Sequence, residues 1–235
     1  MKFSIVIPVY NESKNLPTLV EQIYKALKNE TFELIIVDDD SSDGTPKVIK
    51  KIKRKSMRYF VRKSNKDLTK SCVLGFKKAR YKNILVMDGD LQHRPKDILK
   101  LLKVFKRKEA DFVIGTRNLF KKKKHNLSIL RLTASRLLIL IVNLFLGYKT
   151  SDPMSGFFIF KKEIFLQNKD KLFNKGYKIL MDLIYLFKKE TKSYDVEINF
   201  DSRKKGNSKM NFKILLSLII MIIYKLYAKL LHKFF

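Results

Sequence analysis

Two kinds of hydrophobic pattern alternate along the first half of this chain. Short apolar runs, such as residues 34–37 (LIIV) and 84–87 (ILVM), end at turn residues and are typical of strands in a parallel sheet covered on both faces. Between such runs, apolar residues recur with helical spacing, as they do over residues 14–28, where Asn11 or Ser13 is the expected N-cap. The pattern therefore predicts alternating strands and helices.

The predicted elements of the first half follow one another in strand–helix order. Strands are predicted at residues 3–9, 33–38, 58–61, 83–88 and 111–116, and helices at residues 14–28, 45–54, 69–80 and 95–108. This order implies a doubly wound, Rossmann-like α/β fold with right-handed crossovers. The fingerprint G-x-G-x-x-G does not follow the first strand, so NAD or FAD is not the expected ligand.

The second half begins with a nearly continuous apolar segment. Residues 127–146 predict a helix, and its longest uncharged stretch, residues 137–148, is too short to span about 30 Å of hydrocarbon. Two interpretations are open: a helix buried in the core, or one that packs on the core and touches lipid with one side. The remaining predicted elements are strands at residues 156–160 and 194–200, and helices at residues 177–189 and from residue 211 onward.

Two acidic clusters follow predicted strands, at residues 38–44 (DDDSSDG) and 88–93 (DGDLQH). The carboxyl ends of parallel strands meet at one edge of a sheet, where ligands bind. Carboxylates gathered there repel one another unless a cation or a hydrogen-bonding ligand takes them up, and an Asp-x-Asp turn suits Mg²⁺ or Mn²⁺. Asp and Gly are also ordinary loop and N-cap residues, but two clusters at matching strand ends favour a nucleotide-diphosphate site.

Composition narrows the partners and the compartment. The 235 residues suffice for one large domain, and 51 Lys and Arg against 22 Asp and Glu give a formal net charge of +29. Such a surface suits nucleic acid, anionic lipid or phosphorylated substrates. The single cysteine, Cys72, excludes an internal disulfide and fits a buried thiol in a reducing compartment. The first predicted strand begins at residue 3, too early for a signal peptide, so we expect the cytoplasmic side.

Six motifs extend along almost the whole chain. They lie at residues 6–12 (VIPVYNE), 37–45 (VDDDSSDGT), 88–93 (DGDLQH), 115–117 (GTR), 151–157 (SDPMSGF) and 203–209 (RKKGNSK). With them the chain resembles glycosyltransferase family 2, which has the GT-A fold. Within that family it is most similar to the polyprenol-phosphate (dolichol-phosphate) mannosyltransferases. Gly89 stands where Ala is commoner in the metal motif, a difference that we expect to be harmless.

The resemblance implies a role for most of these residues. Mg²⁺ or Mn²⁺ would be held by Asp88, Asp90 and Gln92 and would bridge the two phosphates of a nucleotide sugar. The implied donor-binding residues are Pro8, Tyr10, Glu12, Val37, Asp39, Asp88, Gly89, Asp90, Gln92, Arg117, Arg203 and Lys209. The implied catalytic residues are Asp90, Arg117, Arg131 and Ser135, of which the last three would bind acceptor phosphate.

Finer expectations accompany these roles. Asp39 is expected to accept hydrogen bonds from the base or ribose, and Arg203 and Lys209 to close over the diphosphate as a lid. His93 is interpreted as a structural partner of the metal loop rather than a ligand. Tyr10 and Val37 have an alternative interpretation as plain core residues.

The acceptor decides what the mechanism needs. Family 2 enzymes invert the anomeric centre by direct displacement, so a hydroxyl acceptor needs a base, for which Asp152 and Asp182 are candidates. A polyprenyl phosphate is already ionised and needs positive charge to position it. The leading hypothesis is transfer of mannose from GDP-mannose to polyprenyl phosphate. The alternative is a UDP-sugar such as UDP-glucose, with the same lipid or a sugar hydroxyl as acceptor.

A distant alternative is a non-catalytic, basic lipid- or nucleic-acid-binding protein. A nucleic-acid-binding module would not place carboxylates at the expected binding edge, and basic motifs interleaved with aromatic residues are missing. We therefore expect no nucleic-acid partner.

The C-terminal segment predicts contact with a membrane surface. The simplest organisation is a catalytic domain over residues 1–210 and an amphipathic helix over residues 211–235. The uncharged run of this helix, residues 214–224, has about half the length that a membrane-spanning helix requires. Lys225, Lys229 and Lys233 follow on one face of the helix. This predicts an interfacial helix with lysines among anionic headgroups, in a peripheral, monotopic enzyme on the cytoplasmic face. The alternative is a helix buried against the catalytic domain or a partner subunit.

Overall fold

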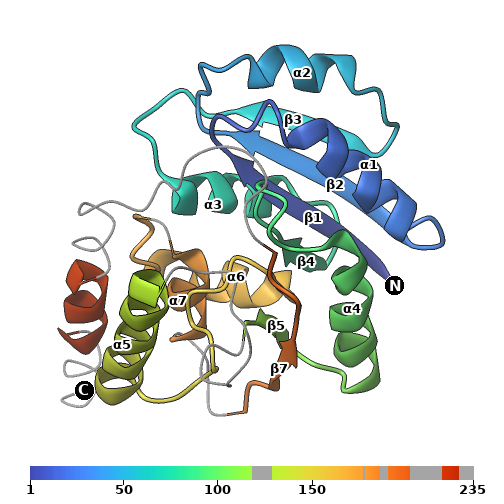
Figure 1. Cartoon of the computed structure of the whole chain (residues 1–235). Coiled ribbons are helices and arrows are strands. Elements are labelled where there is room, and N and C mark those ends of the chain that lie inside the picture. The colour runs from blue at the N-terminus through green and yellow to red at the C-terminus, as the bar shows by residue number, and fades with distance from the viewer. Residues whose placement is uncertain (118–128, 177, 186–189, 202–218, 228–235) are drawn as a thin grey trace.

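A seven-stranded sheet in the order β3-β2-β1-β4-β6-β5-β7 organises the computed structural model of the protein (Figure 1). The structure describes residues 1–117, 129–176, 178–185, 190–201 and 219–227. Within the helix at residues 129–146, a few side chains are not described. The strands are β1 (Lys2–Val9), β2 (Thr31–Asp38), β3 (Met57–Val61), β4 (Asn83–Val86), β5 (Phe112–Thr116), β6 (Phe158–Lys161) and β7 (Ser193–Glu197). The helices are α1 (Leu16–Ala26), α2 (Thr45–Lys51), α3 (Leu68–Lys78), η1 (Pro95–Asp97), α4 (Ile98–Arg107), α5 (Ile129–Leu146), α6 (Lys162–Asn168), η2 (Lys169–Lys171) and α7 (Ile179–Ile184).

The direction of β6 differs from that of the other strands. Strands β3, β2, β1 and β4 are parallel neighbours, whereas β6 runs antiparallel to both β4 and β5, and β5 is parallel to β7. The carboxyl ends of β1, β2, β4 and β5 therefore lie at one edge of the sheet, together with the amino end of β6. The loop before β6, residues 151–157, thus reaches the same edge as the two acidic clusters.

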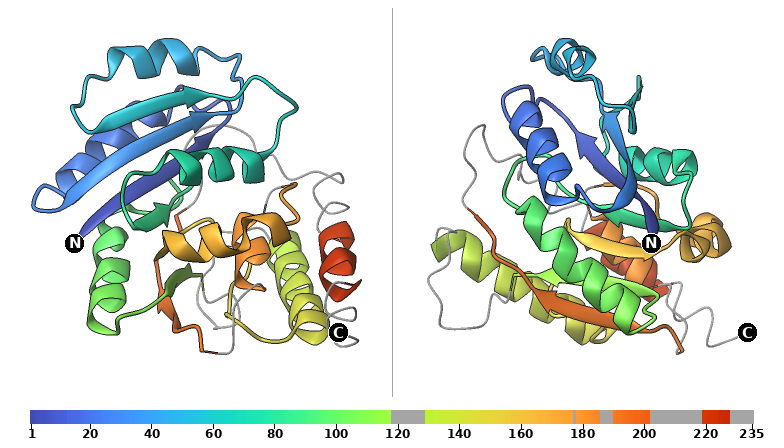
Figure 2. Two further views of the ribbon diagram at one scale, coloured as in Figure 1. Left: turned by 180° about the vertical axis from the view of Figure 1, so that it is seen from behind. Right: turned by 90° about the vertical axis from the view of Figure 1, so that its right-hand side faces the viewer.

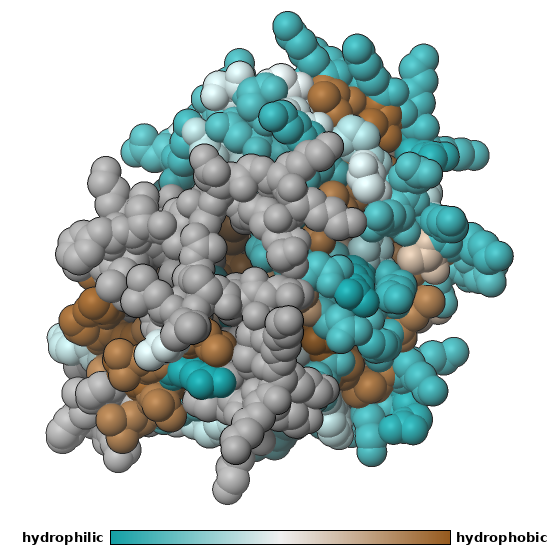
Figure 3. All heavy atoms as spheres, viewed as in Figure 1, coloured by the Kyte–Doolittle hydropathy of each residue, from teal (hydrophilic) through white to brown (hydrophobic). Residues whose placement is uncertain are grey.

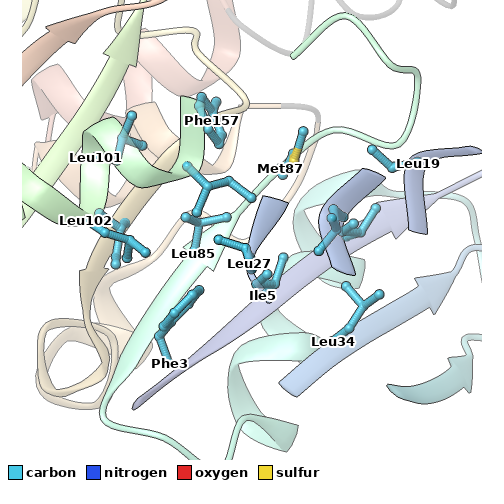
Figure 4. Packing of buried hydrophobic residues seen from close by; sticks show 14 of the residues in the cluster. Phe3, Ile5, Leu19, Leu27, Leu34, Leu85, Met87, Leu101, Leu102 and Phe157 are labelled. Atoms are coloured by element: carbon cyan, nitrogen blue, oxygen red, sulfur yellow. The ribbon is translucent and has the colours of Figure 1, made fainter. Parts of the chain in front are cut away.

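Helices cover both faces of the sheet, as the side views in Figure 2 show. Helices α1, α2 and α4 pack against one face, and α3, α6 and α7 against the other. The alternation of side chains along β1 explains this, because Phe3, Ile5 and Ile7 point into the first layer and Val6 into the second. Figure 4 shows the first layer, where Phe3 and Ile5 lie near Leu27 and Leu85.

Several predicted boundaries need correction. Helix α1 begins at Leu16 with Asn15 in the N-cap position, and not after Asn11 or Ser13. The side chain of Asn11 accepts a hydrogen bond from the Ser42 amide instead of capping a helix. The helix predicted at residues 95–108 is divided into η1 and α4. Helices α6 and η2 were not predicted. The proposed domain boundary at residue 210 lies outside the described residues.

A third apolar cluster joins α5 to the helical residues 219–227. Ile139 and Val142 of α5 are buried with Met221 and Ile222, while the opposite sides of both helices are exposed. Helix α5 therefore packs on the core with one side only, which decides against full burial. Within the described part of the chain, no helix has the length and apolarity needed to cross a membrane.

The expectation for Lys225 is wrong. Its side chain is 5% exposed, and Nζ lies 2.6 Å from Oδ1 of Asp182 in α7. Because helix 219–227 packs against α7, the face that carries Lys225 points into the protein rather than toward headgroups. Lys229 and Lys233 lie outside the described residues.

Candidate active site

Chemically active side chains gather at the edge where β1, β2, β4 and β5 end. Asp39 follows β2, Asp88 and Asp90 follow β4, and Arg117 follows β5. Asp152 comes from the loop before β6. Strands β1, β2, β4 and β5 run in one direction and β6 runs against them, so the fold brings these five side chains to the same edge of the sheet.

Asp88 is held between His93 and the loop before β6. Its Oδ2 lies 3.5 Å from Nε2 of His93, which is stacked on Phe157 and 2% exposed at its side chain. Burial raises the pKa of Asp88, but the hydrogen bond to His93 and the charges of Lys178 and Arg117 outweigh this and keep the pKa below its usual value. The geometry matches the interpretation of His93 as a structural partner.

Gly156 is in close contact with the Asp88 carboxylate. A Cβ atom added at Gly156 would lie 2.1 Å from Oδ2 of Asp88, far inside van der Waals contact. Glycine is therefore needed for the backbone to approach the carboxylate this closely. This is the physical reason for a glycine in the motif at residues 151–157.

Asp90 and Gln92 lie on a tight turn. The turn contains Leu91 at φ 62°, in the left-handed region that is uncommon for such a side chain. Oδ1 of Asp90 accepts a hydrogen bond of 3.1 Å from the Gln92 amide, and Nε2 of Gln92 donates to the Asp201 carbonyl at 3.2 Å. Any coordination by Gln92 is thus left to its side-chain oxygen.

The donor set fits a hard divalent cation. Asp88 and Asp90 supply two carboxylates, and Gln92 an amide oxygen; the described residues contain no group of three or more His, Cys, Asp or Glu that could hold a metal. Mg²⁺ and Mn²⁺ are commonly bound by one or two carboxylates, with water and substrate phosphates as the other ligands. The residues present therefore fit such an ion when a diphosphate shares it.

The loop that carries the candidate metal ligands, residues 88–93, is joined to residues 200 and 201, which follow β7. His93 and Phe200 form an isolated antiparallel bridge, and the Asp201 amide donates to the Gln92 carbonyl at 2.9 Å. Arg94 binds the Asp201 carboxylate with both Nε and Nη2. Phe200 and Asp201 are therefore held against residues 92–94. Arg203 and Lys209, the expected lid residues, lie outside the described residues.

The expected nucleoside side is already rich in internal contacts. Asp39 is 5% exposed and pairs with Arg62, and its Oδ2 accepts a hydrogen bond of 2.6 Å from the Asp67 amide. Arg62 carried no signal in the sequence. The ion pair with Arg62 and the hydrogen bond from Asp67 therefore hold the Asp39 carboxylate in place without a nucleotide.

The remaining donor-site candidates lie close to this network. Val37 is fully buried in the core, in register with the buried Pro8 of β1, so its side chain follows the core interpretation. Tyr10 is partly buried, with Lys66 over its ring at 4.2 Å. Glu12 is 7% exposed and accepts a hydrogen bond of 2.7 Å from Asn15.

Arg117 forms a buried, two-point ion pair with Asp152. Nε donates to Oδ2 at 2.6 Å and Nη2 to Oδ1 at 2.8 Å. Burial raises the pKa of Asp152, but the charge of Arg117 outweighs it and lowers the pKa. A carboxylate bound in this way is a weak base, which argues against the base role considered for Asp152. Ser135 of α5 is partly buried, and the Arg131 side chain is outside the described set.

The second candidate base, Asp182, is also committed. It is fully buried in α7, pairs with Lys225, and accepts hydrogen bonds from the Phe173 and Asn174 amides at 3.0 and 2.9 Å. Its carboxylate thus anchors helix 219–227 and the loop before α7. These contacts leave it poorly suited to take a proton from a substrate hydroxyl.

Lys178 is a charged residue beside the candidate site that the sequence did not reveal. It is the N-cap residue of α7, and its Nζ donates to the Met154 carbonyl at 3.2 Å. The pKa of Lys178 is lowered, mainly by burial and next by the charge of Arg117. The negative charges of Asp88, Asp152 and Asp90 act in the opposite direction. One lysine among 51 basic residues carries no pattern that would have marked it.

Two curated relatives match most of the chain in sequence. The chain is 35% identical over 216 residues to a dolichol-phosphate mannosyltransferase from Pyrococcus furiosus, covering 91% of this chain and 60% of that protein. It is 31% identical to the dolichol-phosphate mannosyltransferase of Mycosarcoma maydis, covering 90% of this chain and 74% of the relative. The chain thus spans less than two thirds of the Pyrococcus protein.

The fold likeness extends to more distant structures. Glucosyl-3-phosphoglycerate synthase from Mycobacterium tuberculosis, in complex with Mn²⁺, UDP and phosphoglyceric acid, superposes with a TM-score of 0.70 at 14% identity. The match covers 97% of this chain and 78% of that one, which confirms the GT-A-like fold. Residues 4–167 match the family model described as glycosyl transferase family 2. On the sequence match and the shared fold, the chain belongs to glycosyl transferase family 2.

Proposed function

We propose that the protein is a metal-dependent, inverting glycosyltransferase that moves a sugar from a nucleoside diphosphate sugar to a polyprenyl phosphate. GDP-mannose is the favoured donor. The carrying observation is that both candidate bases, Asp152 and Asp182, are buried and paired with cations. A phosphate acceptor needs no base, because its oxygen is already ionised near neutral pH. The names of the Pyrococcus and Mycosarcoma relatives support the same acceptor class.

The proposed reaction is a direct displacement. An oxygen of the acceptor phosphate bonds to the anomeric carbon while the bond from that carbon to the β-phosphate oxygen breaks, and the nucleoside diphosphate leaves with the electron pair. A divalent cation held by Asp88, Asp90 and Gln92 would neutralise the charge that builds on the leaving group. Mg²⁺ and Mn²⁺ both suit these ligands.

The chain's own residues would position the two substrates. Arg117 is fixed by Asp152 at the end of β5, so its guanidinium is preorganised for the acceptor phosphate. Arg131 and Ser135 are proposed to contact the same phosphate. The proposed donor site consists of Pro8, Tyr10, Glu12, Val37, Asp39, Gly89, Arg203 and Lys209, together with the metal ligands.

A transfer assay tests the function. Purified protein is incubated with Mn²⁺, polyprenyl phosphate and either radiolabelled GDP-mannose or a radiolabelled UDP-sugar, and organic-phase label is counted. We expect label from GDP-mannose. Label from UDP-glucose alone would mean that the donor is a UDP-sugar instead of GDP-mannose. This alternative is in keeping with the UDP bound in the Mycobacterium structure. Transfer to sugar hydroxyls but not to the lipid phosphate would contradict the proposal.

A peripheral position on the cytoplasmic face of a membrane belongs to the same proposal. The supporting feature is an apolar face shared by α5 and helix 219–227, which lie side by side in Figures 1 and 2 and expose hydrophobic side chains in Figure 3. The apolar face consists of Leu137, Leu140, Leu144, Ile219, Ile220 and Ile223. A lipid acceptor would reach the active site from a bilayer that covers this face.

Carboxylates introduced on the apolar face should weaken membrane binding. The double variant Leu140→Glu/Ile223→Glu is expected to lower sedimentation with anionic liposomes by about tenfold or more, because two apolar contacts are lost and two anionic charges gained. Leu99→Glu and Leu166→Glu are matched controls, since these exposed leucines lie on α4 and α6. Equal sedimentation of wild type and double variant would exclude this face as the contact surface.

A further inference from the structure

The Arg117–Asp152 pair raises a question of charge at the proposed acceptor site. Its two hydrogen bonds, of 2.6 and 2.8 Å, make guanidinium and carboxylate a nearly neutral unit. A phosphate acceptor carries up to two negative charges, and the diphosphate of a bound donor adds more at the same edge, beyond what a divalent cation at Asp88 and Asp90 would neutralise. A further cation would therefore favour the binding of a phosphate beside Arg117.

Lys178 is placed to supply that charge. Its Nζ donates to the carbonyl of Met154, two residues from Asp152 and two residues from Gly156, which contacts Asp88. The ammonium thus lies beside the loop at residues 151–157, which carries Asp152, the partner of Arg117, and also contacts the Asp88 carboxylate. Among the residues that the structure describes, its one hydrogen bond goes to a neutral carbonyl, which a phosphate oxygen can replace with a stronger, charge-assisted bond.

The backbone around Lys178 is fixed independently of its side chain. Gly176, at φ 97°, donates its amide to Oδ2 of Asp67 at 2.8 Å and accepts from the Thr69 amide at 3.0 Å. Asp67 is also the N-cap of α3 and accepts from the Lys70 amide. On the other side, Lys178 leads directly into α7. The described residues on both sides of the Lys178 ammonium, Gly176 and α7, are therefore held by the fold, which favours a preorganised phosphate ligand.

We propose that Lys178 binds the phosphate of the acceptor together with Arg117, as a further substrate-binding residue of the transfer reaction. This inference rests on the proposed function, since it assumes a phosphate acceptor. Among the described residues, Lys178 adds a positive charge that no hydrogen-bonded carboxylate cancels, and Arg117 gives the directional contacts. Loss of the Lys178 charge should affect the acceptor much more than the donor.

The test compares Lys178→Met, Lys178→Arg and the control Lys175→Met in the full chain with Mn²⁺. Lys175 is exposed and three residues away, so it controls for lost surface charge. Lys178→Met should raise the KM for polyprenyl phosphate by about tenfold or more, because a charge-assisted bond is lost. Lys178→Arg should recover most of this loss. Calorimetric binding of the nucleoside diphosphate with Mn²⁺ should change by less than about twofold.

The outcomes separate this inference from the proposed function. Absence of lipid-phosphate transfer by the wild type would refute the function. Calorimetry with a short-chain isoprenyl phosphate, added to the complex with nucleoside diphosphate and Mn²⁺, then still tests Lys178. Equal isoprenyl phosphate binding by wild type and Lys178→Met would overturn the inference. So would a Lys178→Met variant that loses nucleoside diphosphate and acceptor affinity to the same extent, since Lys178 would then belong to the donor site or to the structure.

Discussion

Replacing Asp90 with Asn should reduce sugar transfer by about a hundredfold or more, and EDTA should have an effect of the same order. Asp90 is nearly buried on the tight turn after β4 and supplies one of two carboxylates to the candidate cation site. A cation that neutralises a leaving diphosphate contributes several kcal/mol to the transition state. The measurement is initial rate with labelled nucleotide sugar, with and without added Mn²⁺.

Gly156→Ala offers an independent route to the same site. The added methyl group would collide with the Asp88 carboxylate, so this variant should lose metal-dependent transfer although it removes no ligand. Alanine at Gly147 or Gly44 is unsuitable as a control, because these glycines have φ values of 84° and 87°, at which alanine is strained. Ser193→Ala, at the start of β7 and away from the carboxyl edge, serves instead. Full activity of Asp90→Asn, or of the wild type in EDTA, would refute the metal role.

Lys225→Met should lower the free energy of unfolding by about 3 kcal/mol, because it leaves the buried carboxylate of Asp182 without its cation. For a chain of this size such a loss corresponds to a fall in Tm of roughly 6–12 °C. Thermal unfolding followed by circular dichroism measures it. The double variant Lys225→Met/Asp182→Leu should recover part of the loss, since it removes the unpaired charge, although the Phe173 and Asn174 amides then lack an acceptor.

Lys161→Met is the matched control. The Lys161–Asp111 pair has the same N–O distance, 2.6 Å, but both side chains are substantially exposed, at 36% and 25%. Solvent screens such a pair, so its loss should cost less than about 1 kcal/mol. If Lys225→Met and Lys161→Met unfold at the same temperature, helix 219–227 is not anchored by its buried ion pair.

The role of Lys225 also changes how the C-terminal helix should be tested. Removal of residues 212–235 would take away Lys225 together with Met221 and Ile222, and would uncover Asp182 and Met181 of α7. Loss of liposome binding by such a truncated chain would therefore confuse anchoring with instability. Point substitutions on the exposed apolar face avoid this, because they leave the buried face intact.

The sequence by itself determined the elements of the first half and the place of the chemistry. Continuous apolar runs and helical spacing identified β1 to β5 and the four α-helices between them, because burial on both faces imposes those patterns locally. The two acidic clusters could be assigned to one sheet edge, since parallel strands end together. Family motifs such as residues 88–93 then pointed to a nucleotide-diphosphate site. Element boundaries shifted by a few residues, because caps and turn bonds such as that of Asn11 are not periodic.

Only the tertiary structure decided how the site is completed. The antiparallel direction of β6 brings residues 151–157 to the carboxyl edge, and no local pattern records strand direction. The pairs Arg117–Asp152 and Lys225–Asp182 join residues 35 and 43 positions apart, so their commitment to each other leaves no trace in spacing. Lys178 is indistinguishable in sequence from its many basic neighbours. It becomes a candidate for the site because the fold places it beside Met154, where opposite charges of distant segments meet.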